Sequence, residues 1–123
     1  MNTLEIGDIK YINLANNPIK IKSGDDIFKL AKNKGKKPTI VTEKIILENQ
    51  PIETYILKII RIKDLPDERE GIKIIVPLFI VDAYNQLLSN GEIKARFDLY
   101  SPGKKVFDED GVLLYADGLR IGY

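Results

Sequence analysis

The chain contains no cysteine and no histidine among its 123 residues. Without cysteine there are no disulfides and no thiolate nucleophiles, and without histidine there is no imidazole base. Zinc, copper and haem ligation depends mostly on these same two side chains. The commonest catalytic and metal-binding designs are therefore excluded, so we expect no metal and no cofactor, and a binding protein is favoured over an enzyme.

The chain also lacks long apolar runs and a strong charge of one sign. Its longest apolar runs, residues 56–62 and 72–81, are broken by Lys, Arg or Pro and fall short of the roughly 20 residues that span a bilayer. The first ten residues lack the basic start and apolar stretch of a secretory signal. A net charge of +1 creates no long-range field toward nucleic acid or anionic lipid. We expect no membrane partner and a cytoplasmic location, the host cytoplasm if the protein is viral.

What remains is the composition of an ordinary globular protein. Apolar residues make up 44% and charged residues 30% of a chain whose length matches one domain, so we expect a single domain over residues 1–123. The richness in Ile and Lys is typical of hyperthermophile proteins, although A/T-rich codons explain it equally well. A thermophilic or viral source is therefore a hypothesis.

Alternating and β-branched segments between turn residues predict a sheet-rich fold. The firmest prediction is an antiparallel pair, Thr39 to Leu47 with Ile52 to Lys63, joined by a turn at residues 48–51. Both faces of the second strand are apolar, which predicts a central strand covered on both sides. Further strands are expected at residues 10–14, 19–22, 72–76, 97–100, 105–107, 112–116 and 119–121, with turns at residues 101–103, 108–111 and 117–118.

One helix is predicted, at about residues 77–90. Pro77 supplies a fixed φ for its first turn, apolar residues recur at helical spacing from Leu78 to Leu88, and Gly91 follows the last turn. Residues 23–35 suit either a short helix capped by Ser23 or Asp25, or an edge strand over residues 27–32. The fold class is α+β: a mainly antiparallel sheet or partly open barrel with this principal helix packed on it.

Two charged segments are candidate sites. The basic loop of residues 32–37 carries four lysines that could contact phosphates: Lys32, Lys34, Lys36 and Lys37. No aromatic residue interleaves with them, so base stacking is unsupported, and a solvated loop is the commoner explanation. Asp64, Asp67, Glu68 and Glu70 could hold magnesium, but their Pro- and Gly-flanked loop favours solvated charge. A calcium loop at Asp108 to Gly111 lacks its final acidic ligand.

A third candidate consists of polar residues next to apolar strands. Asn13 ends an early strand, and Arg96 and Asp98 flank Phe97. Such groups are usually hydrogen-bonded within the fold, so a structural role is favoured over a polar binding site.

These residues belong to a wider set of short motifs: Asn13-Leu14 and Pro18, Asp64-Leu65-Pro66 and Gly71, Arg96 to Leu99 with Pro102-Gly103, residues 108–111, and Gly118-Leu119. In this the chain resembles a group of small uncharacterised proteins of bacteria, archaea and their viruses that begin with an Asn-Leu-Thr-Pro-His strand end. The threonine and histidine of that motif are missing here. The resemblance implies that residues 23–35 are extended, and it implies no established activity.

Three functions are compatible with these patterns. The leading hypothesis is a non-enzymatic protein that binds a protein partner or self-assembles, for example one from a virus or mobile element of a thermophile. The first alternative is weak nucleic-acid binding through the basic loop, and the second is a magnesium-dependent hydrolase that uses the carboxylates of residues 64–70.

Overall fold

The structure, a computed structural model, describes residues 3–33 and 35–121. Seven strands form one sheet in the order β1-β2-β7-β8-β9-β3-β4. Their bounds are Thr3–Ile6 (β1), Ile9–Asn13 (β2), Ile19–Ser23 (β3), Asp26–Leu30 (β4), Ile72–Ile75 (β7), Leu99–Phe107 (β8) and Leu113–Ile121 (β9). Strands β5 (Thr39–Glu48) and β6 (Thr54–Lys63) form a separate hairpin, and the helix α1 spans Leu78–Ser89. The predicted α+β class with one principal helix is confirmed.

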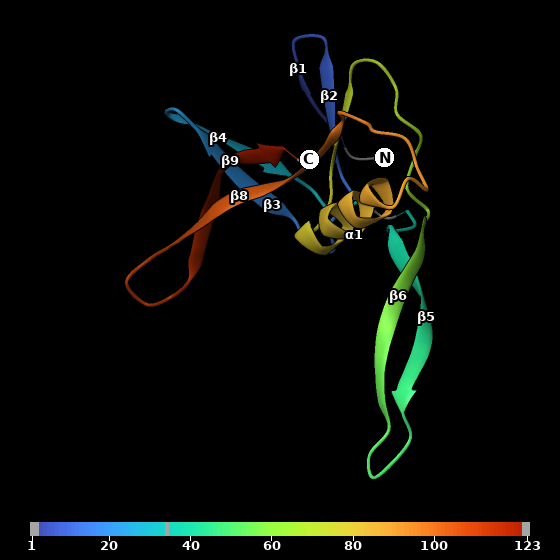
Figure 1. The fold of residues 1–123 in the computed structure, drawn as a ribbon. Coiled ribbons are helices and arrows are strands. Elements are labelled where there is room, and N and C mark those ends of the chain that lie inside the picture. The colour runs from blue at the N-terminus through green and yellow to red at the C-terminus, as the bar shows by residue number, and fades with distance from the viewer. Residues whose placement is uncertain (1–2, 34, 122–123) are drawn as a thin grey trace.

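The large sheet curls into an almost closed barrel, because its two edge strands, β1 and β4, contact each other (Figure 1). The predicted mainly antiparallel sheet is confirmed in part, because the sheet is mixed. Consecutive strands form the antiparallel hairpins β1-β2, β3-β4 and β8-β9, as local turns dictate. The hairpins join through parallel pairings of β2 with β7, β7 with β8 and β3 with β9. Those pairings depend on long connections, which carry no local sequence signal.

The sheet has an apolar layer on each face. On the outer face, Ile74 packs with Ile80 of α1, and both are buried. The next residue of β7, Ile75, points into the barrel, where it packs with Ile21 and Leu30. The alternation along a strand thus divides the core between a layer under the helix and the barrel interior.

The helix begins and ends where its local signals predict. Pro77 is the N-cap residue, with φ −60° and ψ 151°, one position before the first helical residue. At the other end, Gly91 has φ 73° and donates a hydrogen bond to the Leu88 carbonyl, while Glu92 donates to Leu87. These two bonds form a Schellman motif, which requires the left-handed conformation that glycine adopts easily. No described helix has the length and apolar character needed to cross a membrane.

Two predicted turns in the C-terminal third are wrong. Residues 101–103 and 117–118 lie inside β8 and β9, where Ser101 pairs with Arg120 and Lys104 with Asp117. Gly103 serves close packing, because a Cβ there would come within 2.1 Å of the Asp117 carbonyl oxygen. Gly103, which suggested a turn, permits the two long strands to approach each other.

The ambiguous segment 23–35 contains a strand and no helix over its described residues. Asp26–Leu30 forms β4, paired with β3 through a tight turn at Gly24, whose φ is 60°. The extended conformation agrees with the second of the two interpretations. Strand β1 was not predicted, since Thr3–Ile6 is short and half-polar.

Candidate functional site

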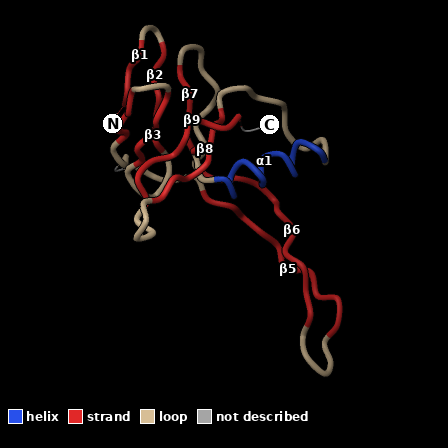
Figure 2. Tube along the Cα trace, turned by 90° about the vertical axis from the view of Figure 1, so that its left-hand side faces the viewer, coloured by secondary structure: helices blue, strands red, loops and turns tan. Residues whose placement is uncertain are grey.

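The most distinctive feature of the molecule is the β5-β6 hairpin, called the arm from here on. Its strands pair only with each other, and the ribbon extends away from the barrel and α1 (Figures 1 and 2). The predicted antiparallel pair is confirmed. The predicted central position is wrong: no strand of the described chain flanks β6 on its other side, and beyond its base its apolar side chains are exposed.

Apolar side chains are exposed on both faces of the arm. Ile45 opposes Ile56 on one face, and Ile46 opposes Tyr55 on the other. Eight large apolar side chains of this hairpin are between 36% and 76% exposed: Ile45, Ile46, Leu47, Ile52, Tyr55, Ile56, Leu57 and Ile60. Exposed apolar surface of this extent is uncommon on a monomeric protein and favours an interaction site.

The arm is anchored only at its base. Ile40 and Ile62 oppose each other there and pack against the core layer under α1. Beyond this point the hairpin has two free edges, and two-stranded hairpins are marginally stable by themselves in water. A surface that covers the distal arm would therefore stabilise it.

The accessible surface of the whole molecule supports the same conclusion. It amounts to 8705 Å² for a chain of 14.0 kDa. A compact monomer of this mass exposes about 6,700 Å². The excess of about 2,000 Å² exceeds the roughly 800 Å² that each partner contributes to a standard protein–protein interface. The chain has more than enough surplus surface to form one.

Charge is distributed unevenly along the arm. The distal part, residues 44–57, carries two glutamates and one lysine, and Glu43 lies opposite Lys58 at the start of the base. The basal part of β6 carries Lys58, Arg61 and Lys63. Lys44 forms an ion pair with Glu53 and lies 4.5 Å from the centre of the Tyr55 ring. The distal end is thus negative overall, whereas the base is positive.

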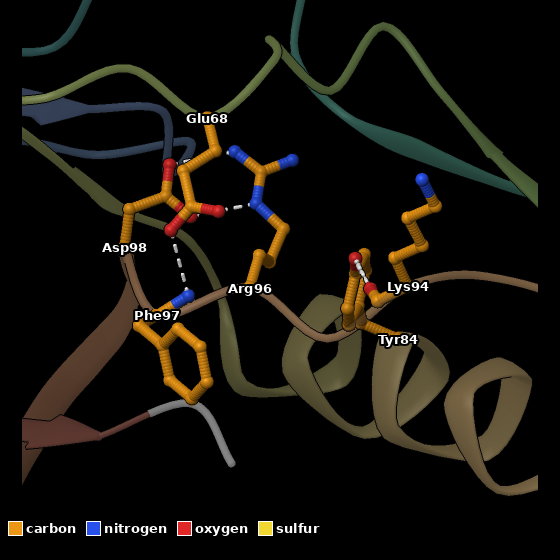
Figure 3. Close-up of polar contacts among 6 residues, drawn as sticks. All are labelled: Glu68, Tyr84, Lys94, Arg96, Phe97 and Asp98. Atoms are coloured by element: carbon orange, nitrogen blue, oxygen red, sulfur yellow. Dashed lines mark hydrogen bonds and ion pairs between the residues drawn. The ribbon is translucent and has the colours of Figure 1, made fainter.

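The predicted polar site at Arg96 and Asp98 is a buried ion pair (Figure 3). The Arg96 Nε and Nη2 atoms donate to the two Asp98 carboxylate oxygens, each over 2.6 Å, and the side chains are only 10% and 5% exposed. Glu68 accepts a hydrogen bond from the Phe97 backbone N–H over 2.9 Å. The Tyr84 hydroxyl donates to the Lys94 carbonyl. The cluster joins the start of β8 to α1 and to the loop before β7.

Electrostatics support a structural role for this cluster. Burial by itself would lower the pKa of Arg96, but the hydrogen bonds and charge of Asp98 outweigh it and raise the pKa above its ordinary value. Burial also raises the pKa of the Tyr84 hydroxyl. Arginine therefore stays charged and tyrosine stays neutral at ordinary pH. Neither group is poised for proton transfer, which suits a fixed structural connection.

Asn13 belongs to a second, separate network. It is fully buried, its amide donates to the Asn17 carbonyl over 3.0 Å, and its side-chain oxygen accepts from the Ala15 N–H over 2.9 Å. The Asn33 side chain donates to the Asn13 carbonyl over 2.9 Å. These bonds connect the end of β2 to the segments after it and after β4. The structure therefore does not bring Asn13 together with Arg96 and Asp98 as one polar site.

The charged loops show no assembled site among the described residues. In the basic loop, Lys32 and Lys36 are exposed, Lys37 donates to the Asn33 carbonyl, and Lys34 lies outside the described residues. Burial, followed by the charge of Lys32, lowers the pKa of Lys37. Among the acids of residues 64–70, the Glu68 carboxylate accepts a hydrogen bond from the Phe97 backbone N–H. Residues 3–33 and 35–121 hold no group of three or more acidic side chains suited to a metal ion. Nucleic-acid binding by the lysines stays a prediction.

The chain matches no protein-family model, and no curated protein or solved structure is similar to it. The resemblance to the uncharacterised group therefore stays a prediction, as do the source and the cytoplasmic location.

Sequence reasoning missed the arm as a surface, although it predicted its strands. The available signal was a hairpin with apolar residues on both faces. A strand in the middle of a sheet shows the same pattern, and the two cases differ only in whether the rest of the chain supplies a covering layer.

Proposed function

We propose that this protein is non-enzymatic and self-assembling, and that two copies associate through their β5-β6 arms. The observation that carries the proposal is the set of eight exposed apolar side chains on a hairpin that projects from the barrel. Burial of apolar surface is the main driving force of association. Two such arms would cover each other's apolar faces.

Charge favours a second copy as the partner. If two arms lie antiparallel, the negative distal end of each one meets the positive base of the other. Glu48 of one copy then faces the region of Arg61 in its partner, and a two-fold axis repeats that contact. A parallel arrangement would place like charges together at both ends.

A charge-exchange experiment tests both the arm and its orientation. Glu48→Lys alone creates two Lys–Arg contacts per dimer, and Arg61→Glu alone creates two Glu–Glu contacts. If each contact changes by about 0.3–1 kcal/mol, each single variant should self-associate about threefold to thirtyfold more weakly than the unaltered protein. Sedimentation velocity over a range of concentrations measures this change.

The decisive sample is an equimolar mixture of the two single variants. In a mixed antiparallel dimer, the lysine introduced by Glu48→Lys meets the glutamate introduced by Arg61→Glu at one contact, and the original pair of Glu48 with Arg61 forms the other. The mixture should therefore associate as tightly as the unaltered protein, and so should the double variant. Lys20→Glu, on an exposed position of β3, is the matched control and should leave association unchanged.

Two results would overturn the proposal. One is an unaltered protein that stays monomeric at all concentrations, and the other is a mixture no tighter than its separate components. If the unaltered protein associates but only the second result is seen, another surface or arm orientation holds the dimer. If the unaltered protein stays monomeric, a protein of different sequence is the better candidate for the arm.

A further inference from the structure

The barrel interior is incompletely filled. An open pocket of about 390 Å³, called the cavity from here on, lies on the inner face of the sheet, and its lining includes the edge strands β1 and β4, which approach each other. Its apolar walls come from β1, β3, β4, β7 and β9 through Leu4, Ile21, Phe28, Leu30, Ile75 and Leu119. Closed sheets of about eight strands are wide enough either to be filled by side chains or to hold one small ligand. In this barrel, the side chains leave part of the interior unfilled.

One cation lies among these apolar residues. Lys73 of β7 lines the cavity together with Tyr11 and Tyr100. Tyr11 is the direct partner of Lys73 in the parallel pairing of β2 with β7, and Tyr100 pairs with Ile75 in the adjacent ladder. The Lys73 ammonium lies 5.8 Å from the centre of the Tyr11 ring and 5.1 Å from that of Tyr100. The two aromatic rings hold the ammonium at the cavity wall.

The ammonium has capacity for an anion. Within the described part of the chain, no carboxylate lies within ion-pair distance of it. An ammonium carries three N–H donors, and contact with the face of a ring leaves donors available. A carboxylate beside Lys73 would receive charge-assisted hydrogen bonds, which are stronger than neutral ones.

We infer that this cavity binds an aliphatic monocarboxylate of medium chain length, with its hydrocarbon tail inside the barrel and its carboxylate at Lys73. The volume lies at the lower end of the range of ligand pockets, about 300–1,000 Å³. It is also well above the roughly 150 Å³ of an apolar cavity that takes up benzene. The inference depends on the barrel alone and is independent of the proposed role of the arm.

The direct test is calorimetric titration of the whole chain with octanoate and, in parallel, with 1-octanol. Both probes have the same tail, but only octanoate carries a charge. Lys73→Met keeps an unbranched side chain of similar length and removes the ammonium. It should weaken octanoate binding about tenfold to a hundredfold while the affinity for 1-octanol stays within about twofold. Lys20→Met, which removes an exposed lysine of β3, is the matched control and should change neither affinity.

A second variant tests the site of the tail. Leu4→Trp adds bulk at the edge strand and should abolish binding of both probes. Methyl chemical shifts of the unaltered protein locate the ligand without any variant. Octanoate should shift the Ile75 and Leu119 methyl signals, which face the cavity, and leave those of Ile80, buried under α1, in place. This measurement decides the matter even if Lys73→Met fails to fold.

Three results would overturn the inference. They are octanoate binding that is absent at millimolar concentrations, binding that Lys73→Met leaves unchanged, and shifts confined to the layer under α1.

Discussion

The double substitution Ile46→Thr and Leu57→Thr should separate the proposed dimer into folded monomers. The two side chains lie on the same face of the arm and are 50% and 57% exposed. Burying one such side chain completely is worth about 1.5–3 kcal/mol, so covering the exposed half contributes about 0.7–1.5 kcal/mol. A two-fold dimer covers four of them. The loss is then up to about 3–6 kcal/mol, or about a hundredfold to ten-thousandfold in the dissociation constant.

The same substitutions should hardly affect folding of the monomer. Threonine retains β-branching and suits a strand, and the removed groups already face solvent in the single chain, so the free energy of unfolding should change by about 1 kcal/mol or less. Sedimentation velocity gives the dissociation constant, and urea denaturation of the dilute protein gives the stability.

A matched control lies in the other long hairpin. Phe107 and Leu113 oppose each other in the pairing of β8 with β9, and they are 53% and 51% exposed. Phe107→Thr with Leu113→Thr removes a similar amount of exposed apolar surface outside the arm. Association should remain unchanged. If this control dissociates the protein and the arm variant does not, the interface lies on β8-β9 and the reasoning from the arm is refuted.

Two further predictions concern the buried cluster. Asp98→Ala should lower the free energy of unfolding by about 3–5 kcal/mol, because it leaves the Arg96 guanidinium buried without its partner. The double variant Arg96→Met with Asp98→Ala should lose less of this free energy than Asp98→Ala alone, and urea denaturation of both variants checks this. The raised pKa of Tyr84 means that the folded state holds its proton longer than the unfolded state, so its contribution is complete below about pH 10 and is lost as the pH rises through the folded pKa. The stability of the unaltered protein should therefore fall more steeply above about pH 10 than that of Tyr84→Phe, and equal slopes in urea denaturation would contradict this assignment.

Local signals explain which elements could be predicted. The helix depends on Pro77 at its start, Gly91 at its end and an apolar face between them, and each of these acts within a few residues. The hairpin β5-β6 likewise follows from β-branched strands around a turn. Prediction failed at Gly103, because glycine occurs both in turns and where two strands approach closely. Here it permits the close approach to Asp117, and the sequence alone does not distinguish the two cases.

Non-local features could not be predicted for a physical reason. Parallel pairing of β2 with β7 joins residues that lie far apart in the chain, such as Ile12 and Ile74, and the free energy that selects it comes from burial of both under α1. Nothing in the sequence around either residue identifies the other as its partner in the sheet. The structural role favoured for Asn13 agrees with its buried network, but its hydrogen bonds to the segments after β2 and β4 follow from the same distant packing.

The two apolar surfaces left open by folding differ in what can cover them. The arm is convex, with side chains on both faces and two free strand edges, so only another macromolecule can bury most of it. The barrel cavity is concave and holds about 390 Å³, which matches a small molecule with a single anionic group at Lys73. Because the arm packs against the body at its base, through Ile40 and Ile62, substitutions in its distal part should leave the barrel packing intact. The proposed assembly and the inferred ligand binding can therefore be altered one at a time.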